Sequence, residues 1–226
     1  MKNLIKFSCL SMIFFMTSSV FAQKMMKKGV VKFEVTDISS DDPQASMMKG
    51  TTMDLYFTKE KQRVEINMMG GLVRVNTISN PEAKEEVVLS DMMGSKTMVK
   101  TPSTDIEKRN QEMEKLNKLV ISYDKKDTKK IAGYDTYRAN IKMESGDTII
   151  AYITQQIQPE NSYFNKMFKG LDGFPLEYII SVQGMKMTYA ALEVSDAIDA
   201  KAFEIPEGYE EITMEEFQKR VGGMKF

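Results

Sequence analysis

The sequence predicts a mainly β (α+β) domain built on an antiparallel sheet. Three observations carry this prediction: apolar and polar side chains alternate along most of the chain, the turns between alternating segments are short, and only two or three segments have helical spacing. The chain has 226 residues, with 31 basic and 32 acidic side chains and 42% hydrophobic content. This composition is typical of one globular domain with its own core.

The beginning of the chain has the pattern of a signal peptide over residues 1–22. Two lysines precede an apolar run at residues 9–20, and the Val-Phe-Ala sequence ending at Ala22 fits the positions that a signal peptidase reads. Cleavage after Ala22 leaves residues 23–226 as a single β-rich domain, periplasmic or secreted. No later segment is apolar over the ~20 residues that a spanning helix needs, so we expect no transmembrane segment in the mature chain.

Most residue types that catalysis requires are missing. The chain has no histidine, and its one cysteine, Cys9, lies in the predicted signal, so the mature chain offers neither imidazole nor thiol. The acidic pairs Asp41-Asp42, Asp124 with Asp127, and Glu210-Glu211 lie in polar segments typical of solvated turns. The sequence therefore predicts no enzyme, no cofactor and no metal site. Its balanced charge also argues against a nucleic-acid partner.

Strands with one polar face account for most of the mature chain. Met53, Leu55 and Phe57, for example, alternate with more polar neighbours. The predicted strands cover residues 30–37, 52–58, 63–68, 72–78, 86–89, 96–100, 119–123, 134–143, 148–154, 176–183 and 185–194. Short turns leave no room for crossover helices and so predict antiparallel pairing. These turns are Gly70-Gly71, Asn80-Pro81, Ser145-Gly146-Asp147 and Gln183-Gly184.

Helices are predicted at two capping boxes, in which a threonine N-cap precedes a glutamate by three residues. The first box is Thr104 with Glu107, and the second is Thr213 with Glu216. The apolar stripe after the first box can lie on one sheet face and consists of Ile106, Met113, Leu116 and Val120. A shorter apolar pair, Phe217 and Val221, follows the second box and predicts a short C-terminal helix.

An aromatic segment at residues 163–174 also has helical spacing over residues 163–171. It ends beside Gly170 and Gly173, which are suited to a hinge. Two interpretations remain open at this point. The segment either docks into the core or forms a movable lid over one sheet face.

Three short sequences carry a resemblance to a known family. They are Ile131-Ala132-Gly133-Tyr134, Gly173-Phe174-Pro175-Leu176-Glu177 and the run from Phe203 to Tyr209. They resemble an exported bacterial family of unknown function that is similar to the LolA/LolB-like lipoprotein carrier group. The resemblance implies a curved antiparallel sheet or open half-barrel, with one or two helices covering the concave face, and an apolar ligand. It also implies an arginine that latches the helical cover, for which the candidates are Arg63, Arg74 and Arg138.

Methionine is unusually frequent, with 20 in the chain, and it often occurs in adjacent pairs such as Met68-Met69 and Met92-Met93. Methionine fills irregular gaps in cores, and it also lines surfaces that adapt to varied apolar ligands. A third interpretation is capture of cuprous copper by thioether sulfur. Adjacent residues of a strand point to opposite faces, and this makes the copper interpretation the weakest.

The sequence thus predicts an exported, non-enzymatic protein that holds a lipid, an acyl chain or a lipidated polypeptide in a half-barrel cavity. The alternative is a structural or interaction protein of the cell envelope with a self-filled core. A lipid or a lipoprotein is the expected partner. The predicted apolar contacts are Met68, Tyr163, Phe164, Met167, Phe168, Leu171, Leu176, Tyr178, Ile180, Met185, Met187 and Tyr189.

Overall fold

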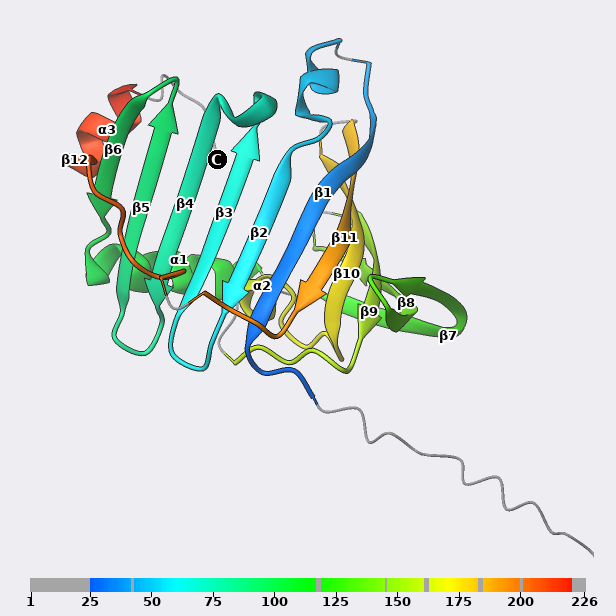
Figure 1. Cartoon of the computed structure of the whole chain (residues 1–226). Coiled ribbons are helices and arrows are strands. Elements are labelled where there is room, and N and C mark those ends of the chain that lie inside the picture. Colours follow the sequence, from blue (N-terminus) through cyan, green and yellow to red (C-terminus); the bar gives the residue numbers. More distant parts are fainter. Residues whose placement is uncertain are drawn as a thin grey trace, which may run out of the picture.

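The computed structural model contains one open, curved sheet of 12 strands among its described residues, with helices against its concave face (Figure 1). The structure describes residues 25–41, 43–116, 119–144, 146–160, 163–182, 185–199 and 201–220, with only the backbone described at residues 43–44, 114–116, 163 and 182. The predicted signal peptide and its cleavage site lie outside these residues. So do the turn residues Ser145, Gln183 and Gly184 and the predicted helical residue Val221.

Strands account for most of the described elements. They are β1 (Gly29–Ser39), β2 (Thr52–Phe57), β3 (Gln62–Met68), β4 (Val73–Asn80), β5 (Glu85–Met92), β6 (Ser95–Lys100), β7 (Val120–Ile131), β8 (Tyr134–Lys142), β9 (Thr148–Thr154), β10 (Phe174–Val182), β11 (Met185–Ser195) and β12 (Glu210–Glu211). The helices are α1 (Ser103–Leu116), α2 (Tyr163–Met167) and α3 (Met214–Arg220), with short 3-10 turns η1 (Pro43–Met48) and η2 (Met69–Gly71).

The strand order is β12-β6-β5-β4-β3-β2-β1-β11-β10-β9-β8-β7. Sequence neighbours pair as hairpins within each half of the sheet, and β1 joins the halves by pairing with β2 on one side and β11 on the other. Among the described strands, only the pair of β12 with β6 is parallel, and the others are antiparallel. The predicted fold class, a mainly β open curved sheet with helices on the concave side, is confirmed.

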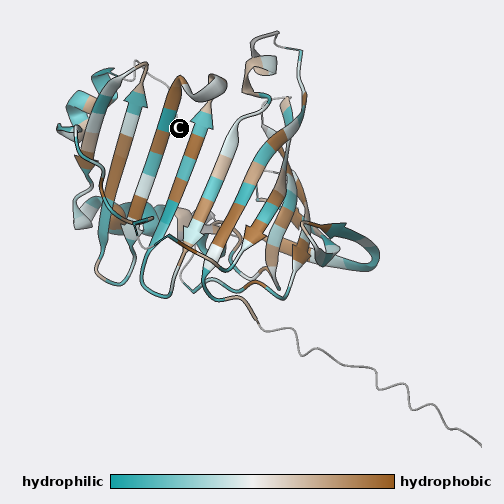
Figure 2. Ribbon diagram, in the orientation of Figure 1, coloured by the Kyte–Doolittle hydropathy of each residue, from teal (hydrophilic) through white to brown (hydrophobic). Residues whose placement is uncertain are grey.

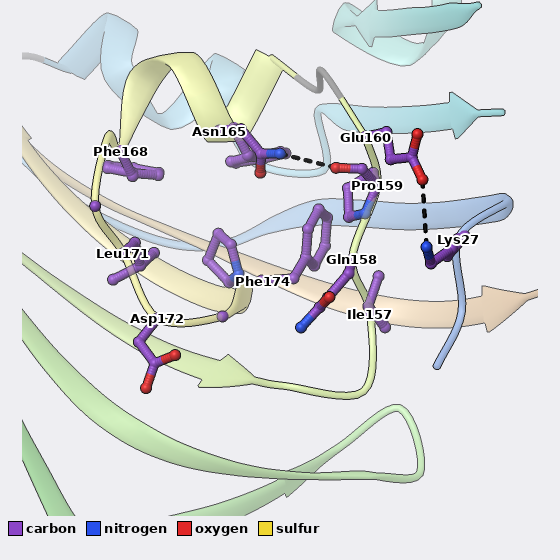
Figure 3. A pocket seen from close by; sticks show the side chains of 14 residues that line it. Lys27, Ile157, Gln158, Pro159, Glu160, Asn165, Phe168, Leu171, Asp172 and Phe174 are labelled. Carbon is purple, nitrogen blue, oxygen red and sulfur yellow. Dashed lines mark hydrogen bonds and ion pairs between the residues drawn. The ribbon is translucent and has the colours of Figure 1, made fainter. Parts of the chain in front are cut away.

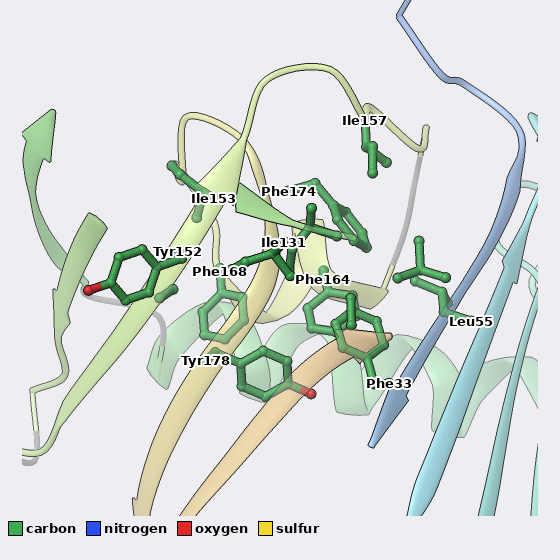
Figure 4. Close-up of a cluster of buried hydrophobic side chains, with 14 of the residues drawn as sticks. Phe33, Leu55, Ile131, Tyr152, Ile153, Ile157, Phe164, Phe168, Phe174 and Tyr178 are labelled. Carbon is green, nitrogen blue, oxygen red and sulfur yellow. The ribbon is translucent and has the colours of Figure 1, made fainter. Parts of the chain in front are cut away.

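The core lies on the concave face around β1, where apolar side chains of both sheet halves meet (Figure 4). Val31, Phe33, Leu55 and Phe57 alternate with polar residues along β1 and β2 and are almost completely buried. Burial of one such side chain contributes about 1.5–3 kcal/mol to the free energy of folding. The period-two pattern therefore sets which face of each strand carries the core.

A second layer covers part of the convex face. The segment after β11 crosses β2–β5 to reach β12 beside β6 (Figure 1). Its carbonyl at Ala202 accepts a hydrogen bond from Nη1 of Arg63 at 3.0 Å, and the backbone N–H of Ile212 donates to the Met98 carbonyl at 2.9 Å. Leu89 points to the convex face of β5, the face that this segment crosses, and is completely buried.

The two capping boxes have different outcomes. At Thr213 the prediction is confirmed: the Glu216 N–H donates to the Thr213 hydroxyl at 3.2 Å, and the Thr213 N–H donates to the Glu216 carboxylate at 2.9 Å. At Thr104 the prediction is wrong, because α1 already includes Ser103 and its first turn is held by the Pro102 carbonyl. Proline supplies that carbonyl while its fixed φ starts the turn.

Two other boundaries differ from those predicted. Val120 lies in β7 rather than on the α1 stripe, and its side chain is exposed. β7 also continues beyond Tyr123 to Ile131, with a bulge between Asp124 and Thr128. A bulge breaks strict alternation, so a periodicity argument ends the strand too early.

Candidate functional site

The β10–β11 hairpin brings the predicted strand contacts onto one face. Tyr178 pairs with Tyr189, and Ile180 pairs with Met187. The two tyrosine rings stack with centroids 5.0 Å apart and an interplanar angle of 6°. Burial raises the pKa of Tyr189, as expected for a phenol within an apolar face. This register places the predicted residues of both strands on the concave side.

Helix α2 and the residues after it pack against the concave face of this hairpin. The Phe164 ring lies 5.6 Å from Tyr178 and 5.8 Å from Phe33, and Phe168 lies 6.3 Å from Tyr178 (Figure 4). Both phenylalanines are buried. Of the two interpretations of the aromatic segment, the structure supports docking into the core. The helix is also shorter than predicted and ends at Met167.

The predicted contacts therefore divide into two groups. The buried group is already covered by the protein's own side chains and consists of Phe164, Phe168, Leu176, Tyr178 and Met187. The half-buried group consists of Met68, Met167, Leu171, Ile180, Met185 and Tyr189. At Tyr163 only the backbone is described. Nearly half of the predicted site is thus self-filled core rather than accessible surface.

A further apolar area lies on the same face across β3–β5. Ile66 pairs with Val75, and Met68 pairs with Val73, which in turn pairs with Met92. We define the open concave surface as Val64, Ile66, Met68, Val73, Val75 and Met92. All six side chains are half-buried. Of these six residues only Met68 was predicted as a contact, because the alternation of β3 and β4 does not show which strands a helix will cover.

Helix α1 is fixed beside this surface by a buried carboxylate. Arg109 donates to both Glu86 oxygens, at 2.9 and 2.6 Å, and the Thr101 hydroxyl donates to Glu86 at 3.0 Å. Burial lowers the pKa of Lys166 on α2, and the nearby Arg109 lowers it further, whereas Glu86 opposes the shift. The sheet and both helices thus meet around Glu86.

Among the described residues, Arg109 links α1 to the concave face of the sheet, and Arg220 links α3 to Glu210 on β12; neither was predicted from the sequence as a latch. Arg63 instead bonds to Asn76 and to the convex crossing segment. Arg138 pairs with Asp127 at 3.3 Å, and Arg74 is exposed. None of the three arginines implied by the resemblance performs that role in the structure.

A pocket of about 400 Å³ opens beside α2 (Figure 3). Its floor is aromatic and buried, with Phe164 and Phe174, whereas its rim carries the Lys27–Glu160 ion pair at 3.3 Å. The loop of Asp172 forms one wall and is tied to β8, because the Tyr137 hydroxyl donates to the Asp172 carbonyl at 3.0 Å.

Burial raises the pKa of Tyr137 to about 12, with a smaller contribution from the Asp172 carboxylate. This phenol therefore stays protonated and able to donate at neutral pH. Because polar groups line the rim of the pocket, it suits an apolar chain less well than the open concave surface does.

The described residues contain no group of three or more acidic or cysteine side chains placed to hold a metal ion. None of the helices in the described part of the chain has both the length and the apolar composition to cross a bilayer.

No family model matches the chain, and no curated protein matches it in sequence. Among solved structures, an uncharacterised conserved protein from Thermus thermophilus is 9% identical, with a TM-score of 0.50 over 84% of this chain and 91% of that chain. This similarity concerns the fold alone. MucB has a TM-score of 0.41 at 7% identity over 84% of this chain and 60% of its own. A β-barrel-like protein from Brucella abortus has a TM-score of 0.29 at 8% identity, covering 74% of this chain and 96% of that chain.

Proposed function

We propose that this chain is an exported, non-enzymatic protein that holds an apolar group on its open concave surface. An acyl chain, a lipid or a lipidated polypeptide is the ligand class. The observation that carries the proposal is the contiguous set of half-buried aliphatic and thioether side chains across β3–β5, on the same face as the core. Binding an apolar ligand removes this concave surface from water, which lowers the free energy of the complex.

The second candidate is a structural or interaction protein of the cell envelope. The aromatic filling of the other half of the concave face favours it, because Phe164 and Phe168 occupy the space that a ligand needs there. The two candidates differ in what they expect of β3–β5. A protein that binds apolar ligands takes up such molecules at β3–β5. A structural protein whose concave face is filled by its own side chains does not.

Titration with an environment-sensitive apolar dye tests the proposal. Replacing Ile66 by lysine places an ammonium group in the open concave surface, and we expect dye affinity to fall by about tenfold, because a charge in an apolar contact must be desolvated. In the free protein, lysine at this half-buried position can extend its ammonium group to water, so we expect the fold to be retained; only a bound dye would cover the charge. Circular dichroism and the thermal midpoint check the fold of each variant.

Two matched variants control this experiment. Asn67→Lys introduces the same charge on the same strand but on the convex face, and Leu171→Lys introduces it at the pocket beside α2. Both are expected to bind dye as the wild-type chain does. Loss of binding in Leu171→Lys together with normal binding in Ile66→Lys would move the site to the pocket and contradict the proposal.

A further inference from the structure

One end of the open sheet carries exposed apolar side chains on three neighbouring connections. The β1–β2, β3–β4 and β5–β6 connections lie at this end, and the Met93 N–H joins two of them by donating to the Leu72 carbonyl at 2.8 Å (Figure 1). We define the methionine rim as Met47, Met69, Leu72 and Met93, which are 54%, 45%, 54% and 81% exposed.

The turns at the opposite end of the same strands have more polar side chains. Its two turns, residues 58–61 and 81–84, consist mainly of polar and charged side chains, and Figure 2 shows them in teal. Both ends face water in the described structure, so the fold does not require apolar side chains at either one. The asymmetry therefore indicates a contact that only the methionine rim makes.

Backbone geometry supports the same conclusion. Met69 and Met93 have φ values of 54° and 52°, in the left-handed region, and Gly94 follows Met93 at 90°. Asparagine and glycine are the residues that favour this conformation in tight turns. Methionine is disfavoured in this conformation, and an exposed methionine side chain lowers solubility. The requirements of the fold therefore do not explain why methionine stands at these positions.

Each apolar part of the rim also has a basic residue close behind it in the sequence. Lys49 follows Met47, Arg74 follows Leu72 and Lys96 follows Met93, each within three residues and each exposed. Apolar side chains next to cations are the combination that binds anionic lipid headgroups, because the apolar groups enter the interface while the cations remain at the phosphates.

We propose that the methionine rim docks this protein onto the surface of an anionic bilayer. The four apolar side chains insert at the headgroup level, and the three cations contact lipid phosphates. The inference goes beyond the proposed function, since it concerns a different surface and holds whether or not the concave face carries a ligand.

Vesicle sedimentation tests the inference, using the processed chain and vesicles of phosphatidylethanolamine with phosphatidylglycerol. The test variant combines Met69→Asn, Leu72→Ser and Met93→Asn. Asparagine suits the left-handed positions, so this variant keeps its turns while it loses most of the rim. We expect its vesicle affinity to fall by at least about tenfold, from the lost apolar insertion. Binding of the wild-type chain should also weaken in high salt and on neutral phosphatidylcholine vesicles.

The matched control is Lys84→Asn, which changes a left-handed position, with φ of 55°, at the opposite end of the sheet. It is expected to bind vesicles as the wild-type chain does. Three results would overturn the inference: no vesicle binding by the wild-type chain, equal binding by the triple variant, or an equal loss in Lys84→Asn. Concentration-dependent self-association that the triple variant abolishes, without vesicle binding, would assign the rim to a protein contact instead. A failed dye titration leaves this test unaffected, because it probes another surface.

Discussion

Truncation of Phe164 to alanine is expected to lower the free energy of unfolding by about 3–5 kcal/mol, the range for a buried aromatic side chain that leaves a cavity. Its ring lies against those of Phe33, Phe168, Phe174 and Tyr178, at centroid distances of 5.2 to 6.1 Å. These rings come from the α2 segment, β1 and β10, so they cannot collapse together into the space left behind.

Urea denaturation of the Phe164→Ala variant measures this effect. The control is Leu192→Ala on β11, which removes an exposed apolar side chain and should change the free energy of unfolding by less than about 0.5 kcal/mol. A loss below about 1 kcal/mol in Phe164→Ala would contradict the docking of α2 in the core, since only mobile or exposed side chains are removed so easily.

The second large effect is expected at the carboxylate that holds α1. Replacing Glu86 by glutamine should lower the free energy of unfolding by about 2 kcal/mol, because it removes the charge from a buried, hydrogen-bonded ion pair with Arg109. We place the value below the range for a fully buried pair because the Arg109 side chain is half exposed. Thr101, which also donates to Glu86, loses a charged acceptor in the same change.

Glu107→Gln is the matched control for this change. Glu107 also lies on α1 and pairs with Lys84 in the turn before β5, but both side chains are exposed to water. Its replacement should change the free energy of unfolding by less than about 1 kcal/mol. Equal losses in the two variants, measured by urea denaturation, would show that burial does not strengthen the Glu86 contact.

Strand positions were largely predictable from the sequence because burial on one face leaves a period-two pattern. Leu55 on β2 and Val64 on β3 occupy the same pattern and even pair across the sheet, yet one is completely buried and the other is half-buried. Leu55 lies within the core cluster, whereas Val64 packs against its edge, and the extent of that core depends on contacts between distant segments. Local alternation therefore predicts the face but not whether that face is filled or open.

Helix starts were less predictable for a similar reason. Thr104 and Thr213 have the same local motif, but only Thr213 forms the cap, because α1 begins at Ser103 and the Pro102 carbonyl accepts the hydrogen bonds of its first turn. The methionine rim was not predictable as a surface. The adjacent methionine pairs can be read in the sequence. The turns that carry Met69 and Met93, however, come to one end of the sheet only when the hairpins form.

We propose that the open concave surface holds an apolar ligand, and mass spectrometry tests this claim most directly. The chain is purified from its native cells without detergent, extracted with organic solvent and compared with the Ile66→Lys variant treated identically. We predict a lipid or acyl compound that copurifies with the wild-type chain and is depleted from the variant. A wild-type extract that contains no compound above the level in the variant would contradict the claim.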